Sequence, residues 1–371
     1  MDYNQNLVYR IALTLVKGIG AVTAKQVIDT LPDVSMLFKE KARLLEQIPG
    51  VSRRVIADIH TGEALRRAEK ELQFIRKNSI RALFIQDADY PQRMKDCTDA
   101  PIMLYFRGNA NLNAAKIISF VGTRHATAYG REMTEHLIAD IAKAYPDTLI
   151  VSGLAYGIDI QAHRSALKHN LPTVGILAHG LDRIYPAEHR TAAVEMLKQG
   201  GLLTDFMSET NPDKPNFVKR NRIVAGIADC TVVVESAEKG GALITANIAD
   251  SYNKDVFALP GRATDTCSTG CNNLIKYKKA ALITSANDIF REMCWLEDQK
   301  GAPQAVQRNL FVDLTPEEQT VVAQLTANGK QMNQLCIALD LPISKLAAMM
   351  FELEMKGVVR CFAGGIYRLI L

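Results

Sequence analysis

The chain has 371 residues, a formal net charge of +4, 48% hydrophobic residues and 23% charged residues. This composition excludes a disordered or collagen-like chain and predicts a folded protein of two or three domains. No apolar run approaches the roughly 20 residues that a membrane span needs. The N-terminus carries an acid and no basic stretch, so we expect no signal peptide and a cytoplasmic location. Seven scattered cysteines without a C-x-x-C pair predict reduced thiols, no metal site and no disulfide framework.

The first segment, residues 1–77, has helical periodicity and contains no strand-like run. Residues 15–31 and 44–59 repeat one pattern: an apolar helix end, a turn of the form G-I-G or P-G-V, and a second helix. Glycine permits such a tight turn, and the amide groups that begin the next helix can hold a phosphate. We therefore expect a helix-hairpin-helix (SAM-like) domain. Two interpretations stay open, namely DNA contact at these turns and a purely structural helical hairpin.

Strands and helices alternate in the second segment, residues 78–295. Apolar strands separated by helices predict a parallel sheet that is covered on both faces, an extended Rossmann-like α/β fold. The expected helices begin near Tyr129, Asp159, Glu188, Val218 and Ala242. The expected strands span residues 82–85, 103–106, 117–121, 149–151, 173–177, 202–205, 231–235, 255–258 and 281–283.

Residues 296–312 lose periodicity and are predicted to be a linker, and residues 313–371 form a separate small unit. Thr315 is a predicted N-cap before Pro316, and two further helices and a β-hairpin around residues 364–365 complete a winged helix. The third helix of this unit has few basic residues, whereas a helix that reads the major groove presents Arg, Lys, Asn or Gln. We expect protein docking or regulation here, with DNA contact as the alternative.

Three stretches, residues 117–130, 149–163 and 231–246, pass from an apolar strand through a small-residue turn into a helix. Ligands of a parallel sheet bind at such turns, beyond the carboxyl ends of the strands. Neither G-x-x-x-x-G-K-[ST] nor G-x-G-x-x-G occurs in the sequence, so we predict a grip on phosphate without nucleotide hydrolysis. The alternative is that these glycines only allow helix and strand to pack closely. The candidate residues in the turns are Arg124, Ser152, Gly153, Lys239, Gly240 and Gly241.

A cation cluster, KRNR, follows the loop 207–217 and is predicted to begin a helix. Its members are Lys219, Arg220, Asn221 and Arg222. With no acid beside them in the sequence, these cations oppose the positive end of the helix dipole, and a bound polyanion would offset that repulsion. Phe217 lies two residues before the cluster and can stack on a base. Cations beside an aromatic ring favour single-stranded nucleic acid over a mononucleotide, the alternative being a solvated helix face.

Several sequence blocks, taken in order, resemble the DNA-processing protein A family, also called Smf. They are VGTRHATAYG, SGLAYGIDIQAH, GLDRIYP, KRNRIVAG, GGALITA and PGRATDTCSTGCNNLI. The resemblance implies a protein that binds single-stranded DNA and loads the recombinase RecA onto it in natural transformation. It also implies a homodimer built through the Rossmann-like domain, with no catalysis and no cofactor. The DNA pocket of the family maps by position onto Arg124, Ser152, Gly153, Phe217, Lys219, Arg220, Asn221, Arg222 and Gly240.

A second interpretation is a nucleotide-processing enzyme of the phosphoribohydrolase kind, which occurs on similar folds. Such enzymes place a Glu after the glycine turn, whereas the stretch GGALITANIAD has none before Asp250. His163, His179 and His189 have no serine or cysteine at nucleophile-elbow spacing. We therefore expect a protein that binds nucleic acid and is not an enzyme, with a non-binding adaptor as a third hypothesis.

Overall fold

The structure is a computed structural model that describes residues 3–296, 314–325, 329–362 and 365–369. The chain divides into two units, residues 1–294 and 295–371, and each is described here by itself. Nearly all of the predicted linker, from residue 297 on, lies outside the described residues. The predicted boundary at residue 77 falls inside the first unit and stays a prediction.

The N-terminal segment is helical, as the sequence predicts. Its helices are α1 (Tyr3–Leu13), α2 (Ala21–Thr30), α3 (Met36–Lys39), α4 (Ala42–Leu45), α5 (Arg53–His60) and α6 (Glu63–Lys77). The two predicted hairpins pack against each other through their glycines. Gly18 has φ +92°, and a Cβ placed on it would lie 3.1 Å from Val55 of α5. Gly50 has φ +83°, and its Cβ would lie 2.8 Å from Thr23 of α2, so both turns need glycine for backbone conformation and for space.

A nine-stranded sheet forms the core, and every predicted strand is present. The strands are β1 (Arg81–Phe84), β2 (Met103–Gly108), β3 (Ile117–Val121), β4 (Leu149–Ser152), β5 (Thr173–Ile176), β6 (Gly200–Thr204), β7 (Cys230–Val233), β8 (Asp255–Ala258) and β9 (Ala281–Leu282). Their order is β1-β2-β6-β5-β4-β3-β7-β8-β9. The seven strands β6-β5-β4-β3-β7-β8-β9 are parallel to one another. β2 pairs antiparallel with β6, and β1 pairs antiparallel with β2 at the edge of the sheet. The predicted Rossmann-like class is confirmed.

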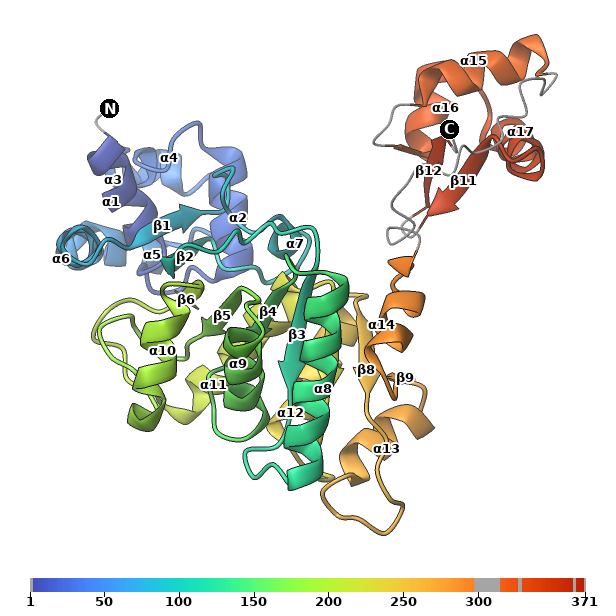
Figure 1. Ribbon diagram of the computed structural model, residues 1–371. Helices are drawn as coiled ribbons and strands as arrows, with labels where there is room; N and C mark the ends of the chain where they lie inside the picture. The colour runs from blue at the N-terminus through green and yellow to red at the C-terminus, as the bar shows by residue number, and fades with distance from the viewer. Residues whose placement is uncertain (1–2, 297–313, 326–328, 363–364, 370–371) are drawn as a thin grey trace. The chain divides into compact units, whose positions relative to one another are not determined.

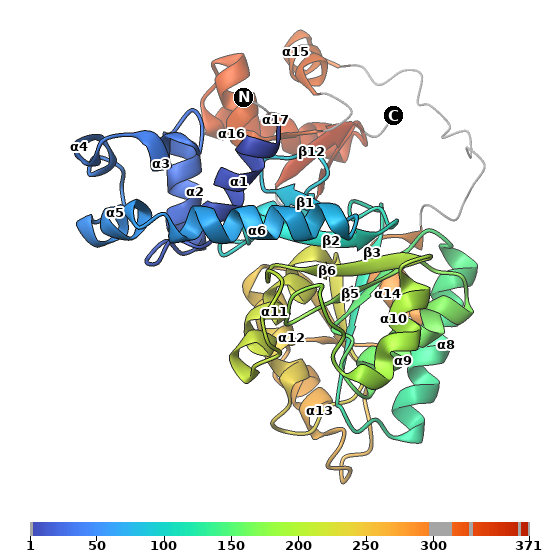
Figure 2. The same cartoon turned by 90° about the vertical axis from the view of Figure 1, so that its left-hand side faces the viewer.

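Helices cover both faces of the sheet (Figures 1 and 2). One face carries α8 (Ala128–Ala144), α9 (Ile158–Lys168) and α10 (Arg190–Met196), with α14 (Ala286–Glu292) beside α8. The other face carries α11 (Lys214–Ile227) and α12 (Gly241–Ser251), with α7 (Gln92–Lys95) against α11, and α13 (Thr269–Lys276) packs on β8. Because the chain winds outward from β3 to β6 and returns at β7, the topological switch point lies between β3 and β7.

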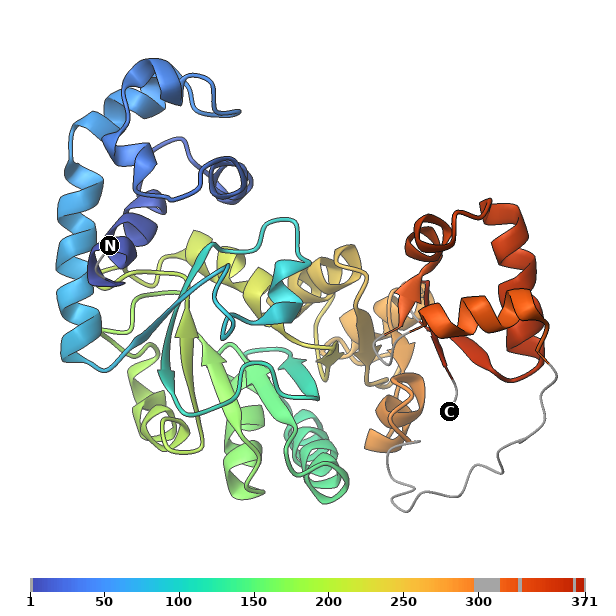
Figure 3. The ribbon, with the colours of Figure 1, turned by 90° about the horizontal axis from the view of Figure 1, so that it is seen from above.

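The helical segment is joined to the sheet at the end where β1 and β2 lie (Figure 3). Its core is continuous with side chains of these strands, among them Phe84, Met103 and Tyr105. Glu71 of α6, which is 2% exposed, accepts hydrogen bonds from Arg67 Nη1 at 2.8 Å and from the Ser208 backbone N–H at 3.0 Å. The Ser208 hydroxyl donates to the same carboxylate at 2.5 Å. One buried carboxylate therefore fixes α6 to the loop that follows β6.

The second unit has the helices and hairpin of the predicted winged helix. It contains α15 (Pro316–Gln324), α16 (Met332–Leu339), α17 (Ile343–Met355), β10 (Lys330–Gln331), β11 (Val359–Phe362) and β12 (Ile366–Leu369), with sheet order β10-β12-β11. Thr315 caps α15 as predicted, while the short β10 was not predicted, and Gly364 of the hairpin turn lies outside the described residues. Phe351 and Met355 of α17 are exposed, so this helix presents an apolar face.

A search of the described residues finds no single helix with the length and hydropathy of a membrane span. Only α16 and α17 taken together meet those two criteria, and they are bent by 113° relative to each other.

The contact at Glu71 leads to a stability prediction. Glu71→Ala should lower the free energy of unfolding by about 3 kcal/mol, because it leaves Arg67 and the Ser208 amide without their buried acceptor. Glu69→Ala, an exposed position on the same helix, should change it by less than about 0.5 kcal/mol. Chemical denaturation of both variants measures the difference, and equal stability of the two would show that Glu71 does not hold the helical segment in place.

Candidate nucleic-acid interface

The turns after β3 and β4 pack directly against each other at the carboxyl edge of the sheet. The Ile158 N–H donates to the Thr123 carbonyl at 3.1 Å, across the two turns. Gly157 has φ +76°, and a Cβ placed on it would overlap the Thr123 carbonyl oxygen. A Cβ on Gly122 would overlap the Ile158 side chain. For Gly122 and Gly157, close packing is therefore the reason for glycine.

The N-terminus of α8 already holds an anion that belongs to the chain. Glu235, which follows β7 and is 2% exposed, accepts a hydrogen bond from the Thr127 N–H at 2.9 Å. The Thr127 hydroxyl caps α8 by accepting from the Gly130 N–H at 3.1 Å. A carboxylate thus lies where the helix dipole of a nucleotide-binding Rossmann fold holds phosphate. In this turn, the side chain of Arg124 is exposed and can still contact a ligand.

Arg220 lies behind this edge as a buried cation. It is 4% exposed, and its Nη1 donates to the Ile176 carbonyl at 2.7 Å, so α11 is tied to the end of β5. A Cβ on Gly153 would overlap the guanidinium, which explains a glycine directly after β4. Burial lowers the pKa of Arg220 to about 10, an effect opposed by the nearby carboxylate of Asp159. The guanidinium stays charged at neutral pH.

The remaining polar groups beneath the edge are enclosed. Burial raises the pKa of Asp159, and the charge of Arg220 opposes that rise. Asp159 is the second residue of α9, whose N-cap is Gly157. His163 Nδ1 lies 2.7 Å from Thr173 Oγ1, and burial lowers the pKa of His163 to about 3, so the ring is neutral. The Ser152 hydroxyl is buried and donates to the Phe120 carbonyl at 2.6 Å.

Two aromatic rings and an exposed cation lie together at this edge. The guanidinium of Arg124 lies 5.4 Å from the ring centroid of Phe217, which is half-buried. The ring of Tyr185, which is exposed, lies 5.9 Å from Phe217 in an edge-on arrangement. We call Arg124, Phe217 and Tyr185 the stacking row. It combines an exposed cation with two aromatic rings, of which Tyr185 is exposed, and this is the chemistry that binds unpaired bases.

The cation cluster at residues 219–222 differs from the prediction in two ways. The helix begins one turn earlier, at Lys214, because Pro215 is accepted in its first turn, so the cluster lies inside α11 and not at its N-terminus. Arg222 also has a local acid: its Nη2 lies 2.6 Å from Asp205, and its Nη1 donates to the Asp99 carbonyl. The prediction of an unneutralised cluster at a helix end was therefore wrong.

Only part of the cluster faces solvent. Lys219 is exposed, and its Nζ lies 5.2 Å from the ring centroid of Phe206. Asn221 is half-buried, and no hydrogen bond of its side chain to another described residue is present. The structure thus separates Lys219, which can meet a ligand, from Arg220 and Arg222, which hold the backbone around it.

The turn after β7 is open. Lys239 is exposed, and a Cβ on Gly241 would have no atom within 4 Å, whereas a Cβ on Gly240 would lie 2.5 Å from the Ser236 hydroxyl. Arg262, in the loop after β8, is also exposed. Within the described part of the chain, no carboxylate pairs with Arg124, Lys219, Lys239 or Arg262.

Sequence reasoning missed Tyr185 and Arg262 as members of this edge. Their signals were present in the blocks GLDRIYP and PGRATDTCSTGCNNLI, each of which places one such residue in a loop near a strand end. Only the sheet order brings those loops beside the stacking row and the turn after β7.

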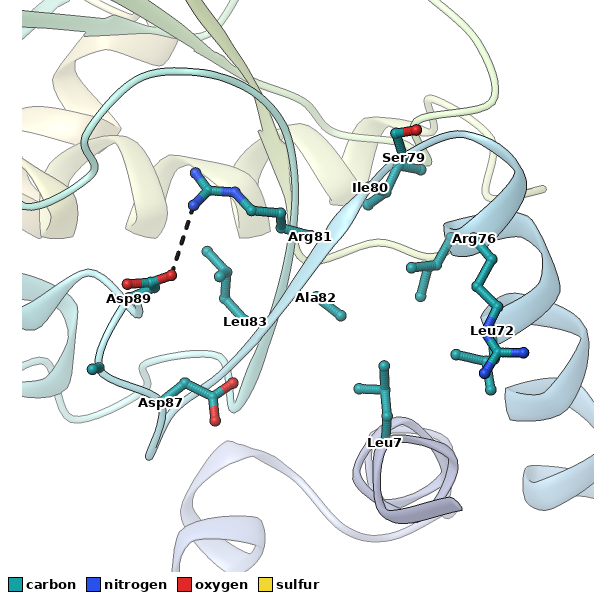
Figure 4. A pocket seen from close by; sticks show the side chains of 12 residues that line it. Leu7, Leu72, Arg76, Ser79, Ile80, Arg81, Ala82, Leu83, Asp87 and Asp89 are labelled. Atoms are coloured by element: carbon teal, nitrogen blue, oxygen red, sulfur yellow. Dashed lines mark ion pairs between the residues drawn. The ribbon is translucent and has the colours of Figure 1, made fainter. Parts of the chain in front are cut away.

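A cavity of about 560 Å³ lies away from this edge, between α1, α6 and β1 (Figure 4). Leu7, Leu72 and Leu83 line it, and an ion pair joins Arg81 to Asp89 over 3.7 Å at its rim. None of the predicted site residues is among its lining residues.

Fold and edge together define a class of protein: a Rossmann-like sheet with a cationic, aromatic carboxyl edge, followed by a winged helix. Residues 81–294 match the family model of the DNA recombination-mediator protein A, and residues 308–365 match that of the DprA winged helix domain. The chain belongs to the DNA recombination-mediator protein A family, also named DprA or Smf.

Individual relatives agree with this assignment. Protein Smf of Synechocystis is 28% identical over 96% of this chain and 97% of its own. The structure of DNA processing protein A from Streptococcus pneumoniae matches with a TM-score of 0.66 at 27% identity, over 77% of this chain and 97% of that one. DNA processing protein A from Helicobacter pylori, described for its single-stranded DNA binding mode, matches with a TM-score of 0.52 at 28% identity, over 58% of this chain and 96% of that one.

Two glycines of the edge allow a matched stability test. Gly153→Ala should lower the free energy of unfolding by about 2–3 kcal/mol, because the new methyl group overlaps the buried Arg220 guanidinium. Gly241→Ala adds the same methyl group into open space at the first residue of α12, and should be neutral or stabilise by up to about 1 kcal/mol. Thermal or chemical denaturation distinguishes them; a stable Gly153→Ala variant would contradict the packing of Arg220.

Proposed function

We propose that this protein binds single-stranded DNA along the carboxyl edge of its sheet and acts as a recombination mediator in natural transformation. The observation that carries the proposal is the stacking row, in which an exposed Arg124 lies over Phe217 beside Tyr185. Bases stack on such rings only when they are unpaired, and the cations follow the phosphate backbone.

The surrounding geometry favours a strand over a mononucleotide. The carboxylate of Glu235 occupies the helix end at which a mononucleotide phosphate would be held. The exposed cations come from four separate segments, around residues 124, 219, 239 and 262, and so span more than one phosphate. The single-stranded DNA binding described for the relative from Helicobacter pylori supports the same ligand.

We further propose that the protein is not an enzyme. Two groups beneath the edge are buried and used internally: Glu235 accepts from the Thr127 N–H, and His163 pairs with Thr173. Neither side chain is exposed to a bound strand, as a group in acid–base catalysis would be. We also propose that the bound strand is delivered to the recombinase RecA through a surface outside the edge.

The DNA-binding proposal predicts how single cations contribute. Arg124→Ala and Lys239→Ala should each weaken binding to single strands of any sequence by about three- to tenfold at low salt. Each should also reduce the slope of log affinity against log salt by about 0.7, because one phosphate contact is lost. Fluorescence anisotropy over a salt series measures both quantities.

Lys143→Ala is the control for that experiment. Lys143 is also exposed, pairs with Asp140 over 3.2 Å, and lies in the last turn of α8, at the opposite end of that helix from the carboxyl edge. It should leave affinity and salt slope unchanged. Equal effects of all three substitutions would show that only the net charge of the protein matters, and would contradict the proposed site.

We propose that the homodimer forms at the β9 edge of the sheet. Among the described residues, β9 pairs with β8 alone, Leu282 is 50% exposed, and Tyr277 before it is 64% exposed. An uncovered strand edge with large apolar side chains is the kind of surface that a second copy covers.

Leu282→Arg should therefore shift the protein toward monomer in light scattering at micromolar concentration. Val194→Arg is the matched control, because Val194 is 49% exposed on α10. If both variants dissociate the dimer, or if neither does, the interface lies elsewhere.

A further inference from the structure

A second cavity, of about 320 Å³, lies where the first helical hairpin meets the carboxyl edge of the sheet. One wall is the turn before α2, with Ile19, Gly20 and Ala21. The other wall follows β6 and includes Asp205 and Phe206, with Lys219 of α11 beside them. The hairpin and the cation cluster are far apart in the sequence, and residues of both line this one cavity.

The start of α2 is open on the cavity side. Gly20 is its N-cap, in an extended conformation, and no side chain caps the helix. Among the described residues, no acceptor is bonded to the backbone N–H groups of Ala21, Val22 or Thr23. Free amides at a helix start, together with the dipole of α2, attract an anion.

The opposite wall contributes charge and an aromatic surface. Lys219 is exposed over Phe206, so its ammonium is available to a ligand. The guanidinium of Arg222 is held by Asp205 and by the Asp99 carbonyl, and its Nε is buried without a partner in the described part of the chain. With two cations and one acid, the wall carries a net positive charge.

An unused acceptor also lines the cavity. The side chain of Asp205 is 4% exposed, and its Oδ1 has no hydrogen-bond partner among the described residues, although Oδ2 is bonded to Arg222. A buried carboxylate oxygen without a donor is costly, so it points to a ligand that brings an N–H. A phosphate has no such group, whereas a nucleobase edge does.

The cavity is held open by contacts on both sides. Lys25 of α2 donates to the Cys97 carbonyl at 2.8 Å, and Glu71 fixes α6 to the loop after β6. Lys219 follows Phe217 by two residues on α11, so one helix carries a residue of the stacking row and a residue of the cavity wall.

We propose that this cavity is a further nucleotide subsite, in which the N-terminus of α2 and Lys219 hold a phosphate of a strand that leaves the stacking row. This inference rests on the proposed function. It assigns to the helical hairpin a direct part in binding single-stranded DNA, at the first hairpin and not at the second.

The test adds one negative charge at two neighbouring positions of α2. Gly20→Asp places a carboxylate in the cavity, and the fold tolerates it because a Cβ there meets nothing within 4 Å and Asp is a favourable N-cap. Val22→Asp adds the same charge to the exposed side of the first turn, outside the cavity lining. Gly20→Asn caps the helix without adding charge.

Binding of wild type and variants is measured with single strands of about 6 and about 20 nucleotides, which bracket the site sizes of such proteins. Gly20→Asp should weaken binding of the long strand by about five- to tenfold and leave the short strand within about twofold, because only the long strand reaches the cavity. Val22→Asp and Gly20→Asn should bind both strands like wild type. Melting temperatures should show that Gly20→Asp is folded.

Equal affinities of Gly20→Asp and Val22→Asp for the long strand would overturn the subsite, as would an equal loss on both strand lengths. Failure of the wild-type protein to bind either strand would instead overturn the proposed function. The two failures are therefore distinguishable.

Discussion

The carboxyl edge of the sheet depends on one buried guanidinium. Removing the charge of Arg220 from water costs several kcal/mol unless partners replace the water. The Ile176 carbonyl and the nearby Asp159 provide that replacement, and the glycine at position 153 provides the space. The ends of β4 and β5 and the first turns of α11 are thus fixed relative to one another by a single side chain, and α11 carries Phe217 and Lys219 of the edge.

This arrangement divides the edge into two layers with different roles. In the deep layer, Glu235 satisfies the start of α8, and Asp159 and Asp205 neutralise the arginines that face inward. In the outer layer, cations without acid partners in the described chain stand beside aromatic rings. The buried charges fix the positions of the helices and strands, and the exposed charges contact the ligand. Because these exposed groups are already in place, binding does not have to pay for ordering them.

The sequence predicted the fold well, because its main signal was local. Runs such as residues 117–121 are apolar on both faces, and that pattern is specific to a strand inside a covered parallel sheet. The order of the strands has no comparable local signal. For that reason Tyr185 was not recognised as a neighbour of Phe217, although Tyr185 lies in the block GLDRIYP and Phe217 was already a candidate residue.

The cation cluster shows why the site was predicted only in part. From the sequence, Lys219, Arg220 and Arg222 look equivalent, since no acid stands beside them. The acids that interact with these arginines lie elsewhere in the sequence. Asp205, near Arg222, comes after β6, and Asp159, near Arg220, lies in the first turn of the helix after β4. Which cation turns inward depends on its position around α11, and that position was misjudged when Pro215 was assigned to the loop and not to the first turn of the helix.

The two helical hairpins look alike in sequence, yet their amide groups are used differently. The second helix of the second hairpin is capped by its own Ser52, whose side chain accepts from the Val55 N–H. In the first hairpin the Lys17 N–H donates to Asp58 at 2.9 Å, so the turn itself is bound by its neighbour. What remains without an internal partner is the start of α2, and it faces the carboxyl edge across the cavity. The second hairpin thus has a capped helix start and binds the first turn, whereas the first hairpin has an uncapped helix start that lines the cavity. The sequence of either hairpin alone does not reveal this difference.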